Sequence, residues 1–228
     1  MKYLGEQLAT FNKQMAYAMA NYQSHGKKIG QFKNIVISGL GGSGITGKII
    51  KSYYLDKINI PVETVSDYQL PKFVNADTLV ILCSYSGNTE ETLSAYHDAK
   101  AKGAYCLTVS VGGKMSDLAA ADGLITYRAE GGYQPRVAFG YPITYLFLIF
   151  AELLGQDIQS ELKEVIEHVS NIEQFKSSSL VVRNFFKTNI RNKYVIVASP
   201  DMEAVAIRFA QQVQENAKLE AFVVVIPE

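Results

Sequence analysis

The sequence has few of the features that mark secreted or nucleic-acid-binding proteins. It contains only two cysteines, Cys83 and Cys106, and both lie beside predicted core strands. We expect them to be buried free thiols in a reducing cytoplasm. Basic and acidic residues balance, with 22 of each, and the basic residues form no stripe. The chain therefore has no net field that would attract nucleic acid.

Long apolar runs are also missing. Charged residues interrupt the apolar side chains of residues 1–20, so we expect no secretory signal there. The most apolar stretch, residues 141–154, is shorter than the roughly 20 residues of a membrane-spanning helix and contains Pro142 and Glu152. It predicts a buried core helix. We therefore expect a cytoplasmic protein that has no membrane partner.

A hydroxyl-rich stretch is the strongest functional signal. Residues 83–92 read Cys-Ser-Tyr-Ser-Gly-Asn-Thr-Glu-Glu-Thr, between a predicted strand (residues 78–82) and a predicted helix (residues 90–102). The hydroxyls of Ser84, Ser86 and Thr89, the helix dipole and the first backbone N–H groups of the helix would all face one oxyanion. The turn has no lysine or arginine, which favours a single phosphate ester over a polyphosphate.

The alternative is that these hydroxyls only cap the helix, which is their commonest role. Five small or hydroxyl-bearing residues between a strand and a helix are more than one cap requires. The stretch therefore favours a ligand site.

A second candidate ligand loop follows the first predicted strand, residues 34–38. It reads Gly39-Leu40-Gly41-Gly42-Ser43-Gly44 and leads into a predicted helix, residues 45–55. Glycine lets a ligand approach the backbone closely. The letters also match the G-x-G-x-x-G turn of dinucleotide-binding folds, but Asp67 comes late for the acidic residue of that motif. Nicotinamide binding stays open as the weaker alternative, because a serine between glycines also suits a phosphosugar.

Predicted strands alternate with predicted helices in the first part of the chain. The strands are residues 34–38, 61–65, 78–82, 104–109 and 124–127. This alternation predicts an α/β fold, an open parallel sheet flanked by helices. Ligands bind such sheets at the carboxyl ends of the strands, where the strand order reverses. The turns that carry Ser43 and Ser84 should therefore meet.

The remaining segments predict the domain organisation. Amphipathic helices are expected over residues 4–28 and 157–176. A break at residues 177–179 precedes a predicted helix over residues 180–189. A βαβ segment follows, with strands at residues 192–198 and 221–226 and a helix at residues 202–218 between them. We expect a first α/β domain with an N-terminal helix (residues 1–155), a helical connection (156–190) and an incomplete second α/β domain (191–228). Two strands cannot form an independent covered sheet.

One cation lies near the predicted site. Pro135 and Arg136 precede the apolar helix, which places Arg136 at the mouth of the site. The helix dipole gives an arginine no benefit at a helix start. We therefore expect Arg136 to hold an enediolate or phosphate oxygen.

Four segments together resemble the sugar isomerase (SIS) domain superfamily, and within it the bifunctional phosphoglucose/phosphomannose isomerases. They are residues 39–44, 84–89, 135–136 and Gln214-Glu215-Asn216-Ala217-Lys218, in matching order over essentially the whole chain. The resemblance implies a flavodoxin-like SIS fold and a homodimer. It also implies reversible isomerisation of glucose 6-phosphate, and also mannose 6-phosphate, with fructose 6-phosphate, through an enediol and without metal or cofactor.

The resemblance also assigns roles to single residues. Ser84, Ser86 and Thr89 would bind the phosphate, Gly41, Gly42 and Ser43 the sugar, Arg136 the enediolate, and Glu215 would move the proton between C1 and C2. A proton transfer next to a carbonyl needs such a carboxylate within hydrogen-bond reach and a positive group near the developing oxyanion.

The chain departs from the family pattern at one point. A family histidine that opens the sugar ring and a lysine near the C-terminus would both fall beyond Glu228, and His25, His97 and His168 match neither position. The alternative function is a non-catalytic phosphosugar sensor. Residues 1–28 show no helix-turn-helix or basic patch that a sensor would carry, and a sensor needs no base at Glu215.

Overall fold

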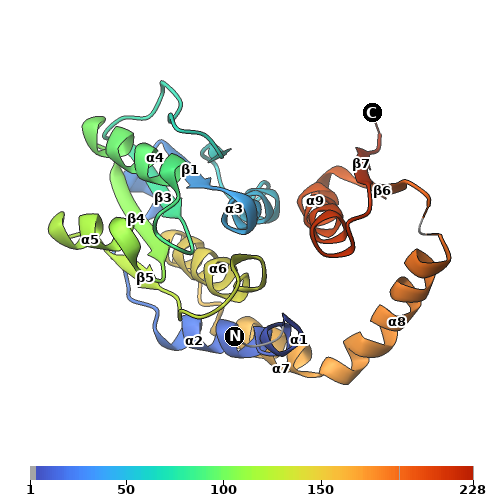
Figure 1. The fold of residues 1–228 in the computed structure, drawn as a ribbon. Coiled ribbons are helices and arrows are strands. Elements are labelled where there is room, and N and C mark those ends of the chain that lie inside the picture. The colour runs from blue at the N-terminus through green and yellow to red at the C-terminus, as the bar shows by residue number, and fades with distance from the viewer. Residues whose placement is uncertain (1–3, 190, 228) are drawn as a thin grey trace. The chain divides into compact units, whose positions relative to one another are not determined.

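The computed structural model describes residues 4–189 and 191–227. The chain forms two compact units, unit 1 (Met1–Ser170) and unit 2 (Asn171–Glu228), and each is described by itself. Unit 1 is an α/β unit built on a five-stranded sheet, and unit 2 contains a two-stranded sheet (Figure 1).

The sheet of unit 1 is open and entirely parallel. Its strands are β1 (Asn34–Gly39), β2 (Val62–Val65), β3 (Thr78–Cys83), β4 (Tyr105–Ser110) and β5 (Thr126–Arg128). They lie in the order β2-β1-β3-β4-β5, which is the flavodoxin-like order. The predicted fold class and all of the strands predicted for this part of the chain are confirmed.

Helices cover both faces of this sheet (Figure 1). The helices of unit 1 are α1 (Leu4–Leu8), α2 (Phe11–Ala20), α3 (Gly41–Tyr53), α4 (Glu90–Ala101), α5 (Gly113–Ala121), α6 (Gly140–Leu154) and α7 (Gln159–Ser170). Alternate residues of β1 enter different clusters, because side chains alternate across a strand. Ile35 and Ile37 pack with residues of α2, α3 and α6, whereas Val36 packs with residues of α4 and α5.

The apolar stretch of the sequence is α6, the predicted core helix. Twelve of its residues are buried, and it ends at Gly155 in the left-handed conformation (φ 68°). Among the helices in the part of the chain that the structure describes, none is long and apolar enough to cross a membrane.

Both cysteines are free and buried, as predicted. Cys83 ends β3 and Cys106 lies in β4. Burial raises the pKa of the Cys83 thiol to about 12 and that of the Cys106 thiol to about 11. Because the thiolate is the reactive form, these side chains serve as core packing and not as nucleophiles.

The single helix predicted over residues 4–28 is wrong, because the chain forms α1 and α2 and then leaves the helical conformation after Ala20. Glu152 of α6 explains why the helix does not continue to residue 28. Its carboxylate accepts hydrogen bonds from the backbone N–H groups of His25 and Gly26 and from the hydroxyls of Tyr22 and Ser24. These N–H groups are therefore satisfied by a side chain of α6 instead of by a helix.

Unit 2 contains α8 (Ile172–Thr188), β6 (Tyr194–Ala198), α9 (Glu203–Gln212) and β7 (Ala221–Val225), and β6 and β7 are parallel. The predicted break at residues 177–179 is wrong, because α8 runs through it. Ser177 and Ser179 donate their hydroxyls to the carbonyl oxygens of Gln174 and Lys176, each at 2.8 Å, within the helix. The break lies instead at Asn171, whose side chain caps α8.

The predicted helix over residues 202–218 also ends differently. Its last part, Val213–Ala217, is a π-helical turn, and Lys218 follows in the left-handed conformation (φ 58°). Short π-helical turns occur often at functional sites. Glu215 lies in this turn.

Candidate functional site

The two candidate ligand loops lie side by side at the carboxyl ends of neighbouring strands. β1 pairs with both β2 and β3, and the strand order reverses between β1 and β3. Gly39, where the first loop begins, is the register partner of Cys83, where the second begins. Ligands of open α/β sheets bind at such a reversal. The turns that carry Ser43 and Ser84 therefore meet, as predicted.

The glycine-rich loop brings the start of α3 close to the end of β1. A Cβ on Gly44 would lie 2.5 Å from the carbonyl oxygen of Gly39, which is too close for any side chain. Gly41 has a φ of 53°, a conformation that favours glycine. Helix α3 therefore begins at Gly41 itself, four residues earlier than predicted, and Gly41, Gly42 and Ser43 form its first turn.

The hydroxyl-rich loop between β3 and α4 is ordered by its own side chains. The hydroxyls of Ser84 and Thr89 are 2.8 Å apart, and the backbone N–H of Gly87 donates to the Ser84 oxygen at 3.1 Å. The backbone N–H of Asn88 donates to the Ser86 oxygen at 3.2 Å. The loop therefore gathers all three predicted phosphate-binding hydroxyls within six residues of chain.

Thr89 occupies the N-cap position of α4, but its side chain does not cap the helix. Its hydroxyl bonds to Ser84 instead. The structure therefore does not support the alternative in which these hydroxyls only cap the helix. The first turn of α4 keeps the positive end of its dipole directed at the loop.

A neighbouring turn fixes the shape of this loop. Gly87 has a φ of 68°, and a Cβ there would lie 1.8 Å from the carbonyl oxygen of Gly112, in the turn between β4 and α5. Backbone hydrogen bonds join Val111 N–H to the Tyr85 carbonyl and Met115 N–H to the Gly87 carbonyl, both at 2.9 Å. The loop is therefore packed backbone against backbone, where only glycine fits.

Arg136 lies in a 3-10 turn, Pro135–Val137, before α6. A Cβ on Gly42 would lie 3.4 Å from the carbonyl oxygen of Pro135, so this turn contacts the first turn of α3. The hydroxyl-rich loop reaches the same segment through Tyr85. The Tyr85 hydroxyl donates to the Glu130 carbonyl at 2.8 Å and accepts from the Tyr133 N–H at 3.1 Å. The structure therefore links both loops to the segment that carries Arg136.

Glu215 lies in unit 2, whereas all other predicted site residues lie in unit 1. It is exposed in its π-helical turn. Arg208, on α9, is its electrostatic neighbour: burial lowers the pKa of the Arg208 guanidinium, and the charge of Glu215 acts in the opposite direction. Sequence reasoning missed Arg208, although Arg208 and Glu215 lie two turns apart on one predicted helix.

Sequence reasoning also missed residues that support the site in unit 1. Tyr85 lies inside the hydroxyl-rich motif, but its aromatic ring gave no reason to expect a bridge to Glu130. Gln7 and Gln14 are buried polar residues within the apolar face of the N-terminal helices. The position of these two glutamines on the apolar face was the sequence signal that could have identified them, because a buried amide needs hydrogen-bond partners.

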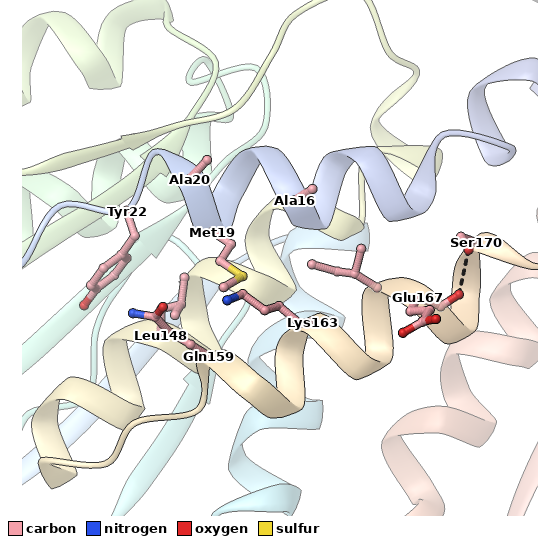
Figure 2. Close-up of a pocket in the computed structure, with 10 residues that line it drawn as sticks. Ala16, Met19, Ala20, Tyr22, Leu148, Gln159, Lys163, Glu167 and Ser170 are labelled. Atoms are coloured by element: carbon pink, nitrogen blue, oxygen red, sulfur yellow. Dashed lines mark hydrogen bonds between the residues drawn. The ribbon is translucent and has the colours of Figure 1, made fainter.

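Two pockets of unit 1 lie away from these loops. One, of about 630 Å³, lies between α2 and α7, where Met19 and Lys163 face each other (Figure 2). The other, of about 580 Å³, is lined by Tyr53, Phe147 and Leu162 among others. No predicted site residue lines either pocket. The volumes of these two pockets therefore say nothing about the chemistry of the two candidate ligand loops.

Comparison with known families finds two matching regions. Residues 28–131 match the SIS domain, and residues 186–228 match the bacterial phospho-glucose isomerase C-terminal SIS domain. The first match contains both ligand loops, and the second contains Glu215.

The chain is also similar to curated proteins that are longer than it is. It is 39% identical to a bifunctional phosphoglucose/phosphomannose isomerase of Caldicellulosiruptor bescii, over 94% of this chain and 66% of that protein. It is 31% identical to a D-glucosamine-6-phosphate 4-epimerase of Sulfolobus acidocaldarius, over 86% of this chain and 61% of that protein. The chain therefore spans slightly less than two thirds of these relatives.

A solved structure supports the fold. The C-terminal domain of glucosamine-fructose-6-phosphate aminotransferase from Francisella tularensis has a TM-score of 0.72 at 16% identity, covering 98% of this chain and 70% of that chain. At that identity the likeness concerns the fold alone. The family matches and the sequence relatives show that this chain belongs to the SIS-domain family, among the relatives of the bifunctional phosphoglucose/phosphomannose isomerases.

Proposed function

We propose that this protein catalyses the reversible aldose–ketose isomerisation of hexose 6-phosphates, glucose 6-phosphate and mannose 6-phosphate with fructose 6-phosphate. The observation that carries the proposal is the pair of loops at the strand-order reversal, where glycine backbone and the hydroxyls of Ser84, Ser86 and Thr89 converge. A relative at 39% identity bears the name bifunctional phosphoglucose/phosphomannose isomerase.

The phosphate would bind at the hydroxyl-rich loop. A phosphate monoester carries up to two negative charges, and the start of α4 with three hydroxyls offers neutral donors and a positive dipole end. The existing bonds of Ser84 and Ser86 to backbone N–H groups pre-order the loop. A bound phosphate would therefore meet donors that are already in place, which lowers the entropy cost of binding. Gly41, Gly42 and Ser43, in the first turn of α3, would contact the sugar.

The chemical step would use one carboxylate and one cation. Glu215 would remove the proton from C2 of the aldose; the C–H electron pair would form the C1=C2 double bond, and the electron pair of the C1 carbonyl would pass to O1 as an enediolate. The proton of the C2 hydroxyl would then pass to O1. Glu215 would return the first proton to C1 while the C2=O bond of the ketose forms. Arg136 would stabilise the enediolate oxygen. We also propose that the protein is a cytoplasmic homodimer, and free buried thiols fit a reducing compartment.

The test measures conversion of fructose 6-phosphate by the full-length gene product, with glucose 6-phosphate and mannose 6-phosphate assayed separately. Glu215→Gln should lower kcat by about 10²–10⁴-fold if Glu215 is the base. Glu220→Gln is the matched control, because Glu220 lies nearby in the chain but pairs only at the surface with Lys193. Tight sugar-phosphate binding without turnover in the wild-type protein would overturn the proposal in favour of a phosphosugar sensor. Turnover of glucosamine 6-phosphate to its C4 epimer, without isomerase turnover, would instead place the chain with the epimerase relative.

A further inference from the structure

Two buried glutamines of the N-terminal helices hydrogen-bond to one segment of backbone. Gln7 of α1 and Gln14 of α2 are 1% and 0% exposed. Gln14 donates through Nε2 to the Val137 carbonyl at 2.9 Å and accepts through Oε1 from the Gly140 N–H at 3.0 Å. Gln7 accepts through Oε1 from the Gln134 N–H at 2.9 Å.

These backbone partners bracket Arg136 along the chain. Gln134 precedes it, and Val137 and Gly140 follow it. The packing is close on the C-terminal side of Arg136, since a Cβ on Gly140 would lie 2.7 Å from the Cβ of Gln14. Thr10, between the two glutamines, donates its hydroxyl to the Tyr133 hydroxyl at 3.2 Å. The N-terminal helices therefore hold this segment on both sides of the arginine.

The bracketed segment has little regular structure of its own. Between β5 and α6 it contains only the short turn Pro135–Val137, which makes few internal backbone bonds. A buried amide that bonds to backbone costs free energy to remove, because both of its partners would stay buried and unsatisfied. Gln14 therefore fixes the path of the chain more strongly than an apolar residue of the same size would.

We propose that Gln14, with Gln7, is a positioning residue that sets the location of the Arg136 guanidinium in the active site. The inference rests on the proposed isomerase function of Arg136. Displacement of a catalytic group by about 1 Å costs on the order of 10²-fold in rate, and sites hold their geometry only when a supporting shell fixes it. Ser84, Ser86 and Thr89 take their hydrogen bonds within the hydroxyl-rich loop, so substrate binding and turnover should separate.

The test uses Gln14→Met and Gln7→Met in the full-length protein. Methionine keeps the length of the side chain and removes its hydrogen bonds. We expect kcat for fructose 6-phosphate to fall about 10- to 100-fold, with KM changed less than about twofold. Hydrogen exchange should accelerate at residues 134–140 and stay unchanged in the hydroxyl-rich loop, residues 84–89. Two separate variants keep the test valid if one of them fails to fold.

Tyr127→Phe is the matched control. The Tyr127 hydroxyl donates to the Gln23 carbonyl at 3.0 Å, so this variant also removes a bond to the N-terminal region, but from strand β5 and not from residues 134–140. It should lower stability and leave kcat unchanged. An equal loss of kcat in Tyr127→Phe, or unchanged exchange at residues 134–140 in both glutamine variants, would overturn the inference.

Failure of this inference can be told from failure of the proposed function. An active wild-type protein whose kcat is unaffected in both glutamine variants contradicts the positioning role alone. A wild-type protein without isomerase turnover contradicts the proposed function, and with it the catalytic part of this inference.

Discussion

Gly87 is the residue on which the shape of the hydroxyl-rich loop most depends. In Gly87→Ala the new Cβ would collide with the Gly112 carbonyl oxygen at 1.8 Å and would sit at a φ of 68°. We expect the free energy of unfolding to fall by about 3 kcal/mol or more, from the clash together with the left-handed conformation. Urea unfolding measures this loss.

Gly123→Ala controls for the backbone conformation. Gly123 has almost the same φ, 66°, but a Cβ there meets nothing within 4 Å. We expect a loss of only about 1–2 kcal/mol in Gly123→Ala. Equal losses in the two variants would contradict the claim that the two turns are packed too closely for a side chain.

Glu152 is the residue whose ionisation ties the N-terminal segment to α6. Burial by itself would raise the pKa of Glu152, but hydrogen bonds from Ser24, Tyr22 and two backbone N–H groups outweigh it and lower the pKa to about 2. A depressed pKa in the folded state contributes stability above the ordinary carboxyl range. That contribution should disappear as the pH falls from about 4.5 to about 2.

Glu152→Gln tests this pH dependence. The variant should be less stable than the wild type at neutral pH, and the difference should shrink as the pH falls through that range, because the protonated wild-type carboxyl then resembles the amide. The measurement is the urea midpoint of both proteins at several pH values. A difference that stays constant with pH would contradict the assignment.

At the scale of elements, the contact of α3 with β1 positions the glycine-rich loop. Gly44→Ala places a Cβ 2.5 Å from the Gly39 carbonyl oxygen and should push α3 away from the strand, at a cost of about 1–3 kcal/mol. The same shift should raise KM, because the first turn of α3 would move. Gly5→Ala in α1 is the control: it meets nothing within 4 Å and should stabilise the helix by about 0.5–1 kcal/mol.

Helix ends were the part of the secondary structure that local pattern predicted least well. The serines at residues 177–179 look like a break in the sequence, yet Ser177 and Ser179 bond to carbonyl groups of their own helix. The N-terminal helix looks continuous to residue 28, yet Glu152, far away in the chain, captures backbone groups of His25 and Gly26. In both places side-chain hydrogen bonds determine where the helix ends, and the spacing of apolar residues does not reveal such bonds.

At the scale of the whole molecule, the two units differ in how well they bury their own apolar residues. Unit 1 covers both faces of its sheet. In unit 2, Val195, Val197 and Phe222 of β6 and β7 are at least half exposed. A two-stranded sheet is at best marginally stable when one face stays uncovered.

We therefore predict that a fragment ending at Ser170 folds cooperatively, whereas residues 171–228 alone do not. Circular dichroism during urea unfolding should show a sigmoidal transition for the first fragment and a gradual change for the second. The first fragment should also bind inorganic phosphate, but it should not isomerise sugar phosphates, because Glu215, the proposed base, is absent. A cooperative transition of residues 171–228 would contradict the prediction.

The sequence by itself determined the α/β class, the order of strands and helices along the chain, and the two loops with their glycines and hydroxyls. These features follow from local chemistry: buried strands need continuous apolar runs, and tight turns need glycine. The tertiary structure alone decided that Gly87 packs on Gly112, that Tyr85 reaches Glu130, and that Gln7 and Gln14 hold the Arg136 segment. Each of these contacts joins residues distant in sequence, and the partner of a buried polar group depends on which elements the packed core brings together.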